Sequence, residues 1–255
     1  MYGRGYGSPG IGFGPPVTPD VVKYLLIANL AVYILSYLTD PLYAYGAVTP
    51  VAFWQLGYLW QPFTYMWLHS KDGVLHLAMN MFVLWMFGSQ VAMAWGPRRF
   101  FRYYLICGVG AGLIIATWPY IGYALNMTSP INLGTHTVGA SGAIYGVMLA
   151  FSLTWPERTI ALIFPPVAFR AIWLIPILFL VALMSPGGNV SHIGHLGGVL
   201  VGWLYLRRQG QVRVGALSPS QLRSRWHRYR MRQKLRAVRY EELERRRRDD
   251  ERRLH

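Results

Sequence analysis

Charged residues are scarce in this chain, and the scarcity is concentrated in its first 206 residues. Asp, Glu, Lys and Arg make up 14% of the 255 residues, whereas a soluble domain of this size carries about 25%. Of the 25 Lys and Arg residues, 17 follow Leu206, together with 6 of the 10 acidic residues. Hydrophobic residues reach 53%, with 10 Trp, 17 Tyr and 11 Phe. This composition argues against a soluble domain and is typical of a polytopic membrane protein.

Cysteine and a signal peptide are also lacking. The single cysteine, Cys107, has no partner in the chain, so an intrachain disulfide framework is excluded. The first residues, MYGRGYGSPGIGFGPP, are rich in Gly, Pro and Tyr and contain no apolar core of the signal-peptide kind. We expect residues 1–20 to form a flexible N-terminal segment and the first apolar segment to act as the insertion signal.

Six apolar segments are long enough to be considered as membrane spans, because about 20 mostly apolar residues cross a bilayer and tilt or local thinning tolerates fewer. The sequence therefore predicts an all-α membrane domain over residues 21–206. The expected spans are residues 21–38, 74–94, 103–120, 138–155, 168–184 and 190–206.

Basic residues predict the orientation of these spans. Lys and Arg are enriched in loops on the cytoplasmic side of a membrane. The connections after the second, fourth and sixth spans hold Arg98, Arg99, Arg102, Arg158, Arg170, Arg207 and Arg208. We therefore expect a multi-pass protein of a bacterial cytoplasmic membrane, with both termini cytoplasmic.

Two further segments have a distinct composition. The outer connection, residues 39–73, is rich in Trp, Tyr and Phe, which is typical of the membrane interface. The tail, residues 207–255, is strongly basic, and its distal part is compatible either with a solvated helix or with binding to anionic lipid. We expect no nucleic-acid partner.

Polar side chains from three spans are expected at one depth, just below the outer surface. His76 and Asn80 lie early in the second span, Ser141 lies in the first turn of the fourth, and His192 and His195 open the sixth. A single Ser or His near a helix end often only satisfies backbone groups. Polar residues inside a membrane are costly, however, and usually line a cavity or pair with one another, so agreement among three spans indicates a functional site.

A serine and a histidine are the minimum pair for nucleophilic catalysis, because the hydroxyl needs an adjacent base. Ser141 lies in VGASGAIYG, where Gly139 is one of the glycines that leave room around the hydroxyl. A second group of glycines, Gly194, Gly197, Gly198 and Gly202, lies around and after His195, so these two helices are able to pack closely. A small-residue packing face without chemistry is the alternative interpretation of both glycine groups.

No carboxylate is available on either helix to orient the imidazole, since Asp and Glu are absent between Glu157 and both Asp72 and Glu241. The sequence thus predicts a dyad. Tyr145 is the candidate to hold the ring by packing, because it lies at i+4 from Ser141 on the same helical face. A core aromatic without that role is the alternative.

Acyl transfer also requires donors for the developing oxyanion. His76 and Asn80 are at i and i+4, hence on one face of their helix. The backbone N–H of Ser141, at the start of its helix, is a third candidate donor.

Four sequence blocks together resemble the rhomboid family of intramembrane proteases, in order and in spacing. These are HLAMNMFVLWMFG at 76–88, GPRRFFRYYL at 96–105, GASGAIYG at 139–146 and HLGGVLVG at 195–202. The stretch between His69 and His76 is longer than is usual in that family.

The resemblance implies roles for the matching residues. Ser141 is then the nucleophile of G-x-S-G, and H-x-G-G selects His195 over His192 as the base. His76 and Asn80 form the oxyanion pair, and Tyr145 is the aromatic residue that stacks on the catalytic histidine.

The resemblance also implies an activity: a serine endopeptidase with a rhomboid-like six-helix bundle, cleaving single-span membrane proteins in or next to their transmembrane segments, with no cofactor or metal. Two other functions compete with it. An inactive rhomboid-like protein that binds membrane clients would keep the fold, and a transporter or channel would also carry polar residues in its helices. The first usually lacks the Ser or the His, and the second usually shows an inverted repeat.

Overall fold

The computed structural model describes residues 14–71, 73–127, 130–161, 167–184, 189–210 and 230–231. The chain divides into two units, residues 1–209 and 210–255. Most of the predicted N-terminal segment, up to residue 13, and nearly all of the predicted tail lie outside the described residues. The account that follows concerns the first unit.

Helices dominate this unit. In chain order the elements are α1 (Asp20–Leu38), α2 (Asp40–Gly46), α3 (Pro50–Gln55), α4 (Gln61–Thr64), a 3₁₀ turn (Tyr65–Trp67), α5 (Val74–Val83), a π turn (Leu84–Gly88), α6 (Ser89–Trp95), α7 (Pro97–Ala124), a 3₁₀ turn (Pro130–Gly134), α8 (Ser141–Thr154), β1 (Thr159–Ala161), β2 (Ala168–Arg170), a 3₁₀ turn (Ala171–Trp173), α9 (Leu174–Met184) and α10 (Asn189–Arg208).

The predicted helical membrane fold is confirmed. Among the described residues, three helical stretches are long and apolar enough to cross a bilayer: Asp20–Leu38, Val74–Trp95 and Pro97–Ala124. The fourth and fifth predicted spans coincide with shorter apolar helices, α8 and α9, and the sixth with α10. The count of six spans stays a prediction.

Several boundaries differ from those predicted. The third span begins at Pro97 rather than at residue 103, directly after Gly96, whose φ of +81° ends the preceding helix. The fourth begins at Ser141 rather than at residue 138, because Gly139 has a φ of +128°. The short antiparallel pair β1–β2 precedes the fifth span and was not predicted.

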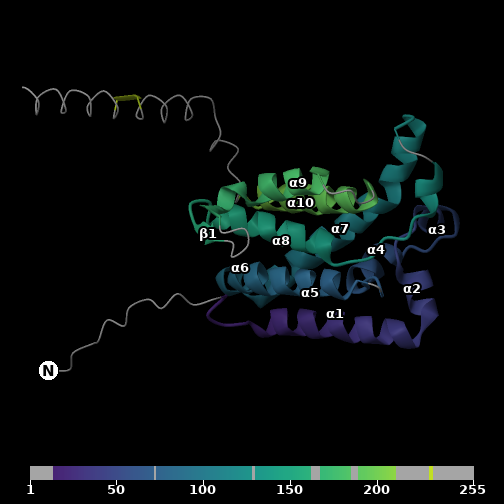
Figure 1. Cartoon of the computed structure of the whole chain (residues 1–255), viewed down its shortest axis with the longest axis horizontal. Coiled ribbons are helices and arrows are strands. Elements are labelled where there is room, and N and C mark those ends of the chain that lie inside the picture. The colour runs from purple at the N-terminus through teal and green to yellow at the C-terminus, as the bar shows by residue number, and fades with distance from the viewer. Residues whose placement is uncertain are drawn as a thin grey trace, which may run out of the picture. The chain divides into compact units, whose positions relative to one another are not determined.

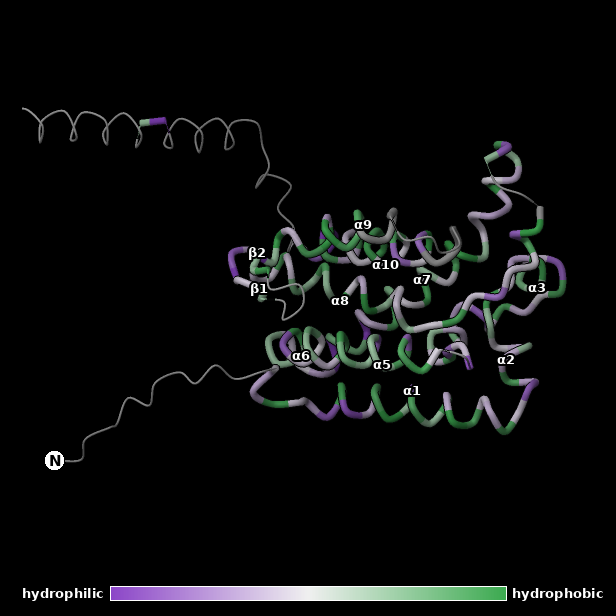
Figure 2. The backbone as a smooth tube through the Cα atoms, in the orientation of Figure 1, coloured by the Kyte–Doolittle hydropathy of each residue, from purple (hydrophilic) through white to green (hydrophobic). Residues whose placement is uncertain are grey.

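The main helices run side by side, with α1 next to α5 and α6, and with α8 between these and α10 (Figure 1). Large apolar side chains of α1 are exposed on its outer face, including Tyr24, Ile27, Leu30 and Ile34, as the hydrophobic stretch of this helix in Figure 2 illustrates. Such a face is suited to contact with lipid.

Glycines allow α7, α8 and α10 to pack closely. A Cβ atom built on Gly198 of α10 would lie 1.8 Å from the carbonyl oxygen of Gly142 in α8, and one built on Gly146 would lie 2.5 Å from Sγ of Cys107 in α7. Backbones in contact at small residues are the usual way in which membrane helices associate. The glycine-rich stretches of α8 and α10 are therefore in direct contact.

The aromatic connection, residues 39–73, folds into α2, α3, α4 and a 3₁₀ turn. Its Tyr65 is buried and donates a hydrogen bond from its hydroxyl to the carbonyl oxygen of Gly108 in α7, at 2.8 Å. Trp60 Nε1 donates to the carbonyl oxygen of Tyr45 at 3.0 Å, which ties α4 to α2. The connection is therefore a packed layer of the fold rather than an open loop.

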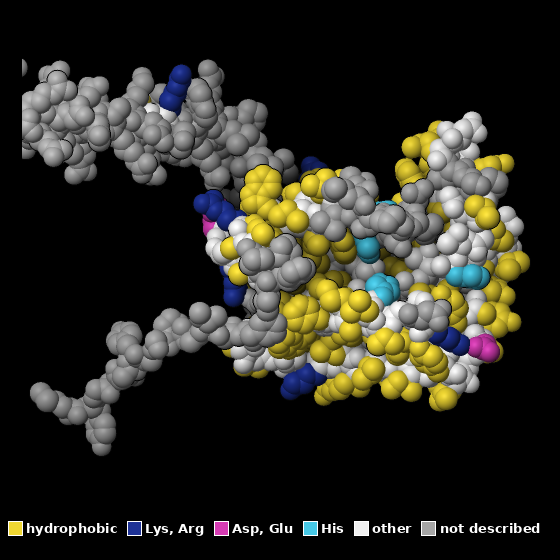
Figure 3. Space-filling model, viewed as in Figure 1, with side chains coloured by type: hydrophobic (Ala, Val, Ile, Leu, Met, Phe, Trp, Pro, Cys, Tyr) yellow, Lys and Arg dark blue, Asp and Glu magenta, His cyan; other side chains and the backbone are white. Residues whose placement is uncertain are grey.

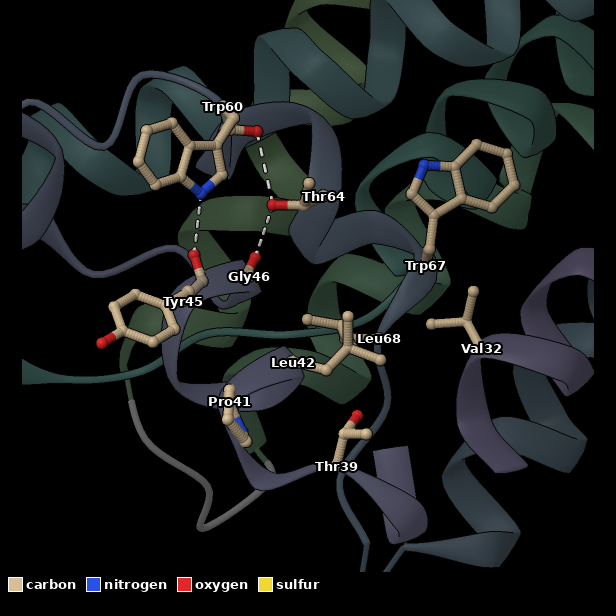
Figure 4. Close-up of a pocket in the computed structure, with 10 residues that line it drawn as sticks. All are labelled: Val32, Thr39, Pro41, Leu42, Tyr45, Gly46, Trp60, Thr64, Trp67 and Leu68. Atoms are coloured by element: carbon tan, nitrogen blue, oxygen red, sulfur yellow. Dashed lines mark hydrogen bonds between the residues drawn. The ribbon is translucent and has the colours of Figure 1, made fainter. Parts of the chain in front are cut away.

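A largely apolar pocket of about 560 Å³ lies between α1 and this connection (Figure 4). Val32 of α1 and Trp67 both line it, and Thr64 closes one side through a 2.7 Å hydrogen bond to the carbonyl oxygen of Gly46. None of the predicted site residues lines this pocket.

Candidate active site

Ser141 is the first residue of α8 and is half-buried. The turn before it is held in place by the N–H of Gly139, which donates to the carbonyl oxygen of Tyr65 at 3.0 Å. The first N–H groups of a helix have no partner within that helix. The backbone N–H groups at the N-terminus of α8 are therefore possible donors at the end of the helix that carries the Ser141 hydroxyl.

His195 lies beside the first two turns of α8 because its neighbours on α10 are in contact with glycines there. A Cβ atom on Gly142 would lie 3.3 Å from the carbonyl oxygen of Gly194, and one on Gly146 would lie 3.2 Å from that of Gly198. These contacts flank His195 on both sides along its helix. The two helices thus bring the predicted base to the helix that carries the predicted nucleophile.

The ring of His195 stacks on the ring of Tyr145. Their centroids are 4.1 Å apart and their planes are inclined by 3°. Both side chains are half-buried, and Nδ1 of His195 makes no hydrogen bond with the described residues. The stack therefore fixes the plane of the imidazole where a carboxylate is absent, and the ring it fixes is the one selected by the sequence motif over His192.

His76 and Asn80 both lie on α5, and a third residue joins them. Nδ2 of Asn80 is 3.3 Å from Nε2 of His76 and 3.1 Å from Nε2 of His69. His76 is exposed, whereas Asn80 is 8% exposed and His69 is fully buried. The predicted oxyanion pair is thus in mutual contact, as the i and i+4 spacing requires.

Gly139 is the point at which the helices meet. A Cβ atom built on it would lie 3.2 Å from Cε1 of His76 and 3.8 Å from Oγ of Ser141. With a φ of +128°, this position strains any residue other than glycine. Gly139 therefore brings the edge of the His76 ring close to the hydroxyl of Ser141.

Figure 3 shows histidine side chains at the surface of a hollow between α5 on one side and α8 with α10 on the other. Within the described part of the chain, no three His, Cys, Asp or Glu side chains are placed to hold a metal ion. The arrangement consists of a hydroxyl, a stacked imidazole, an amide and a second imidazole. Together these groups have what acyl transfer requires: a nucleophile, a base and oxyanion donors.

His69 is the functional candidate that sequence reasoning missed. It precedes α5 in a non-helical connection, so helical spacing gives no reason to place it beside Asn80. Burial, and then the nearby His76, lower the pKa of His69 to about 4, so its ring is neutral near pH 7. The one signal in the sequence that pointed to His69 was its position, as a second histidine shortly before His76.

Curated proteins similar to this chain come from yeast, human and plant. Rhomboid protein 1, mitochondrial, of Saccharomyces cerevisiae is 33% identical over 141 residues, which is 53% of this chain and 38% of that protein. The presenilin-associated rhomboid-like protein, mitochondrial, of Homo sapiens is 32% identical over 142 residues, 54% of this chain and 35% of its own length. RHOMBOID-like protein 6, mitochondrial, of Arabidopsis thaliana is 32% identical over 148 residues, 56% and 41% of the respective chains. The chain thus spans well under half the length of these relatives.

The predicted location in a bacterial cytoplasmic membrane, with cytoplasmic termini, is wrong. All three relatives are mitochondrial proteins, and they point to a mitochondrial membrane instead. The error has a physical reason. The distribution of Lys and Arg orients a chain relative to a bilayer, but it carries no information about which bilayer that is.

The model of the Rhomboid domain matches residues 56–210, more than half of the chain. The match spans the whole site, from His69 in the connection before α5 to His195 on α10. The chain belongs to the rhomboid family.

Proposed function

We propose that this protein is an intramembrane serine endopeptidase in which Ser141 is the nucleophile and His195 is its general base. The observation that carries the proposal is the stack of His195 on Tyr145, at 4.1 Å and 3°, one helical turn from Ser141. It supports the pairing because it fixes the ring of His195 against the helix that begins at Ser141, and these two helices are in backbone contact. A packing role alone does not call for a coplanar ring at that position.

The reaction follows from these groups. Oγ of Ser141 attacks the carbonyl carbon of the scissile peptide bond while His195 takes the hydroxyl proton. His195 then gives this proton to the leaving amine as the C–N bond breaks. Water attacks the resulting ester, His195 accepts the proton of the water, and Ser141 recovers it when the acid product leaves.

The negative charge on the carbonyl oxygen needs donors during both steps. Asn80, His76 and the N–H of Ser141 are the proposed donors, since the edge of the His76 ring and the hydroxyl of Ser141 both lie close to Gly139. Donors already in place before the reaction stabilise such a charge without reorganisation, which is why they contribute strongly to rate.

Substrates are proposed to be single-span membrane proteins, cut within or next to their transmembrane segment. The family supports this class, and so does the setting of the site among apolar helices with a lipid-facing surface. The mitochondrial relatives support a mitochondrial membrane as the location. Within the chain we propose a protease domain over residues 21–206, a flexible segment over 1–20 and a basic tail over 207–255, for which a solvated helix and binding to anionic lipid both stay open.

The test uses the full-length protein in detergent or liposomes with a fluorophosphonate probe, which reacts only with an activated serine. Wild type should be labelled and should cleave a model transmembrane substrate, whereas Ser141→Ala should do neither while retaining its fold and its binding of that substrate. Substrate binding by wild type without any labelling or cleavage would instead identify an inactive client-binding member of the family.

A further inference from the structure

A second apolar groove lies between α1 and α7, apart from the candidate active site. Its volume is about 510 Å³, and none of the proposed catalytic or oxyanion residues lines it. Side chains of both helices and of the aromatic connection form its walls, among them Tyr24, Leu25 and Ala28 of α1, Pro97 and Phe101 of α7, and Trp67.

Two arginines lie at one end of this groove. Arg98 and Arg102 directly follow the two residues by which α7 lines it. Both are exposed, and neither makes an ion pair, a hydrogen bond or a ring contact with the described residues. Arg99, by contrast, places its guanidinium over the ring of Trp95, 4.7 Å from the centroid. Residues four apart share a face of a helix, so Arg98 and Arg102 are able to bind one anion together.

The only acidic side chain among the described residues that line the groove already has a partner. Asp20, at the start of α1, pairs with Nζ of Lys23 at 3.0 Å. This pair is neutral as a whole. The arginines therefore leave this end of the groove with a positive charge that no described side chain offsets.

We propose that this groove binds one anionic phospholipid, with an acyl chain between α1 and α7 and the head-group phosphate on Arg98 and Arg102. Basic pockets between transmembrane helices are typical sites for anionic head groups. The guanidinium group of arginine suits phosphate, because it offers two parallel hydrogen bonds. The proposal does not depend on the protease function, and it concerns the membrane domain rather than the basic tail.

The side chains of the groove favour an acyl chain over another helix. Helices that associate within a membrane usually meet at small residues. Here large side chains project instead, and Tyr24 and Phe101 remain 69% and 38% exposed. A flexible hydrocarbon chain is able to follow such a surface, whereas a helix is held away from it. Since any apolar groove in a bilayer meets lipid chains, the two arginines are what select the head group.

Native mass spectrometry of the delipidated full-length protein in detergent tests the proposal. Phosphatidylglycerol and phosphatidylcholine with identical acyl chains are the probes, and wild type should retain the first more tightly. Arg98→Gln combined with Arg102→Gln should weaken phosphatidylglycerol binding about 30-fold, because each basic side chain near lipid contributes about fivefold. Phosphatidylcholine binding should not change. Equal retention of the two lipids by wild type would contradict the proposal.

A second arginine pair is the matched control for charge. Arg207 and Arg208 are exposed at the end of α10, a helix that contributes none of the described residues lining the groove. Arg207→Gln combined with Arg208→Gln removes the same charge, and it should weaken phosphatidylglycerol binding less than about twofold. Equal weakening by the two double variants would show general attraction to a basic protein and overturn the proposal.

Ala28→Phe tests the acyl-chain part of the site. The added ring fills the groove while both arginines stay, so phosphatidylglycerol binding should fall about 10-fold through overpacking. Leu30→Phe is its control, because Leu30 is 51% exposed on α1 and does not line the groove. Undiminished binding by Ala28→Phe would show that the head group is held without the groove, which contradicts the proposal. A wild-type dimer that Ala28→Phe dissociates would assign the groove to a second copy of the chain instead. Thermal midpoints in lipid-free detergent confirm that each variant is folded.

Discussion

The imidazole of His195 lies parallel to the phenol ring of Tyr145, with a centroid distance of 4.1 Å and an angle of 3° between the planes. The two rings belong to different helices, α10 and α8, whose backbones touch at Gly198 and Gly142. In a serine hydrolase with a triad, a carboxylate orients the histidine. Under the proposed function, the orientation of His195 would come from ring stacking instead, so it would depend on helix packing.

Replacement of Tyr145 should therefore separate stacking from hydrogen bonding. Tyr145→Phe keeps the ring and should retain kcat within about threefold, whereas Tyr145→Ala should lower it about 10-fold, since an aromatic pair contributes about 0.5–1.5 kcal/mol. Cleavage of a model transmembrane substrate by the purified variants measures both. A Phe variant as impaired as the Ala variant would show that the hydroxyl, not the stack, is what matters.

The two histidines of α10 should differ in importance. His195→Ala should eliminate cleavage and fluorophosphonate labelling, because the proposed base is lost, while His192→Ala should only reduce them. The two residues are one turn apart, so both substitutions leave similar gaps in the same helix. If His192 alone proves essential, the assignment of the base is off by one helical turn.

Asn80 should give a graded loss. Asn80→Ala should lower kcat by about 10- to 10³-fold with KM little changed, because the other two proposed donors, His76 and the N–H of Ser141, remain. Asn80→Asp has nearly the same shape but presents an anionic acceptor to the developing oxyanion, so it should be slower than Asn80→Ala. Steady-state kinetics on the same substrate compares them. A change in KM alone would assign Asn80 to packing or substrate entry.

Contact between the two helix backbones should be necessary for both stability and activity. In Gly198→Ala the new methyl group would lie 1.8 Å from the carbonyl oxygen of Gly142, so the helices must move apart. Overpacking of this kind costs about 1–3 kcal/mol, and the shift should also slow labelling of Ser141. Gly134→Ala is the control, since a Cβ there meets nothing within 4 Å. Thermal unfolding and labelling rates should respond to the first substitution and not to the second.

The helical architecture was largely predictable from the sequence, because long apolar segments with charge confined to their ends leave few alternatives in a bilayer. The predicted and observed helix boundaries differ where a single glycine ends or begins a helix. Gly96 and Gly139, both with positive φ, set the starts of α7 and α8 at positions that hydropathy does not resolve. The pair β1–β2 was missed because its three-residue strands carry no recognisable alternation.

Within the site, the sequence by itself determined the relations that helix geometry imposes. Tyr145 had to share a face with Ser141, and Asn80 with His76, since residues four apart are neighbours on any α-helix. Only the tertiary structure decided the rest. The family resemblance implied the stack of His195 on Tyr145, but the tertiary structure supplied the glycine contacts between α8 and α10 that produce it, and it buried His69 against Asn80. Periodicity reports which residues are neighbours along one helix. The contacts of His195 and His69 instead join separate segments of the chain. They depend on how those segments pack, and the spacing of residues along one helix does not determine that packing.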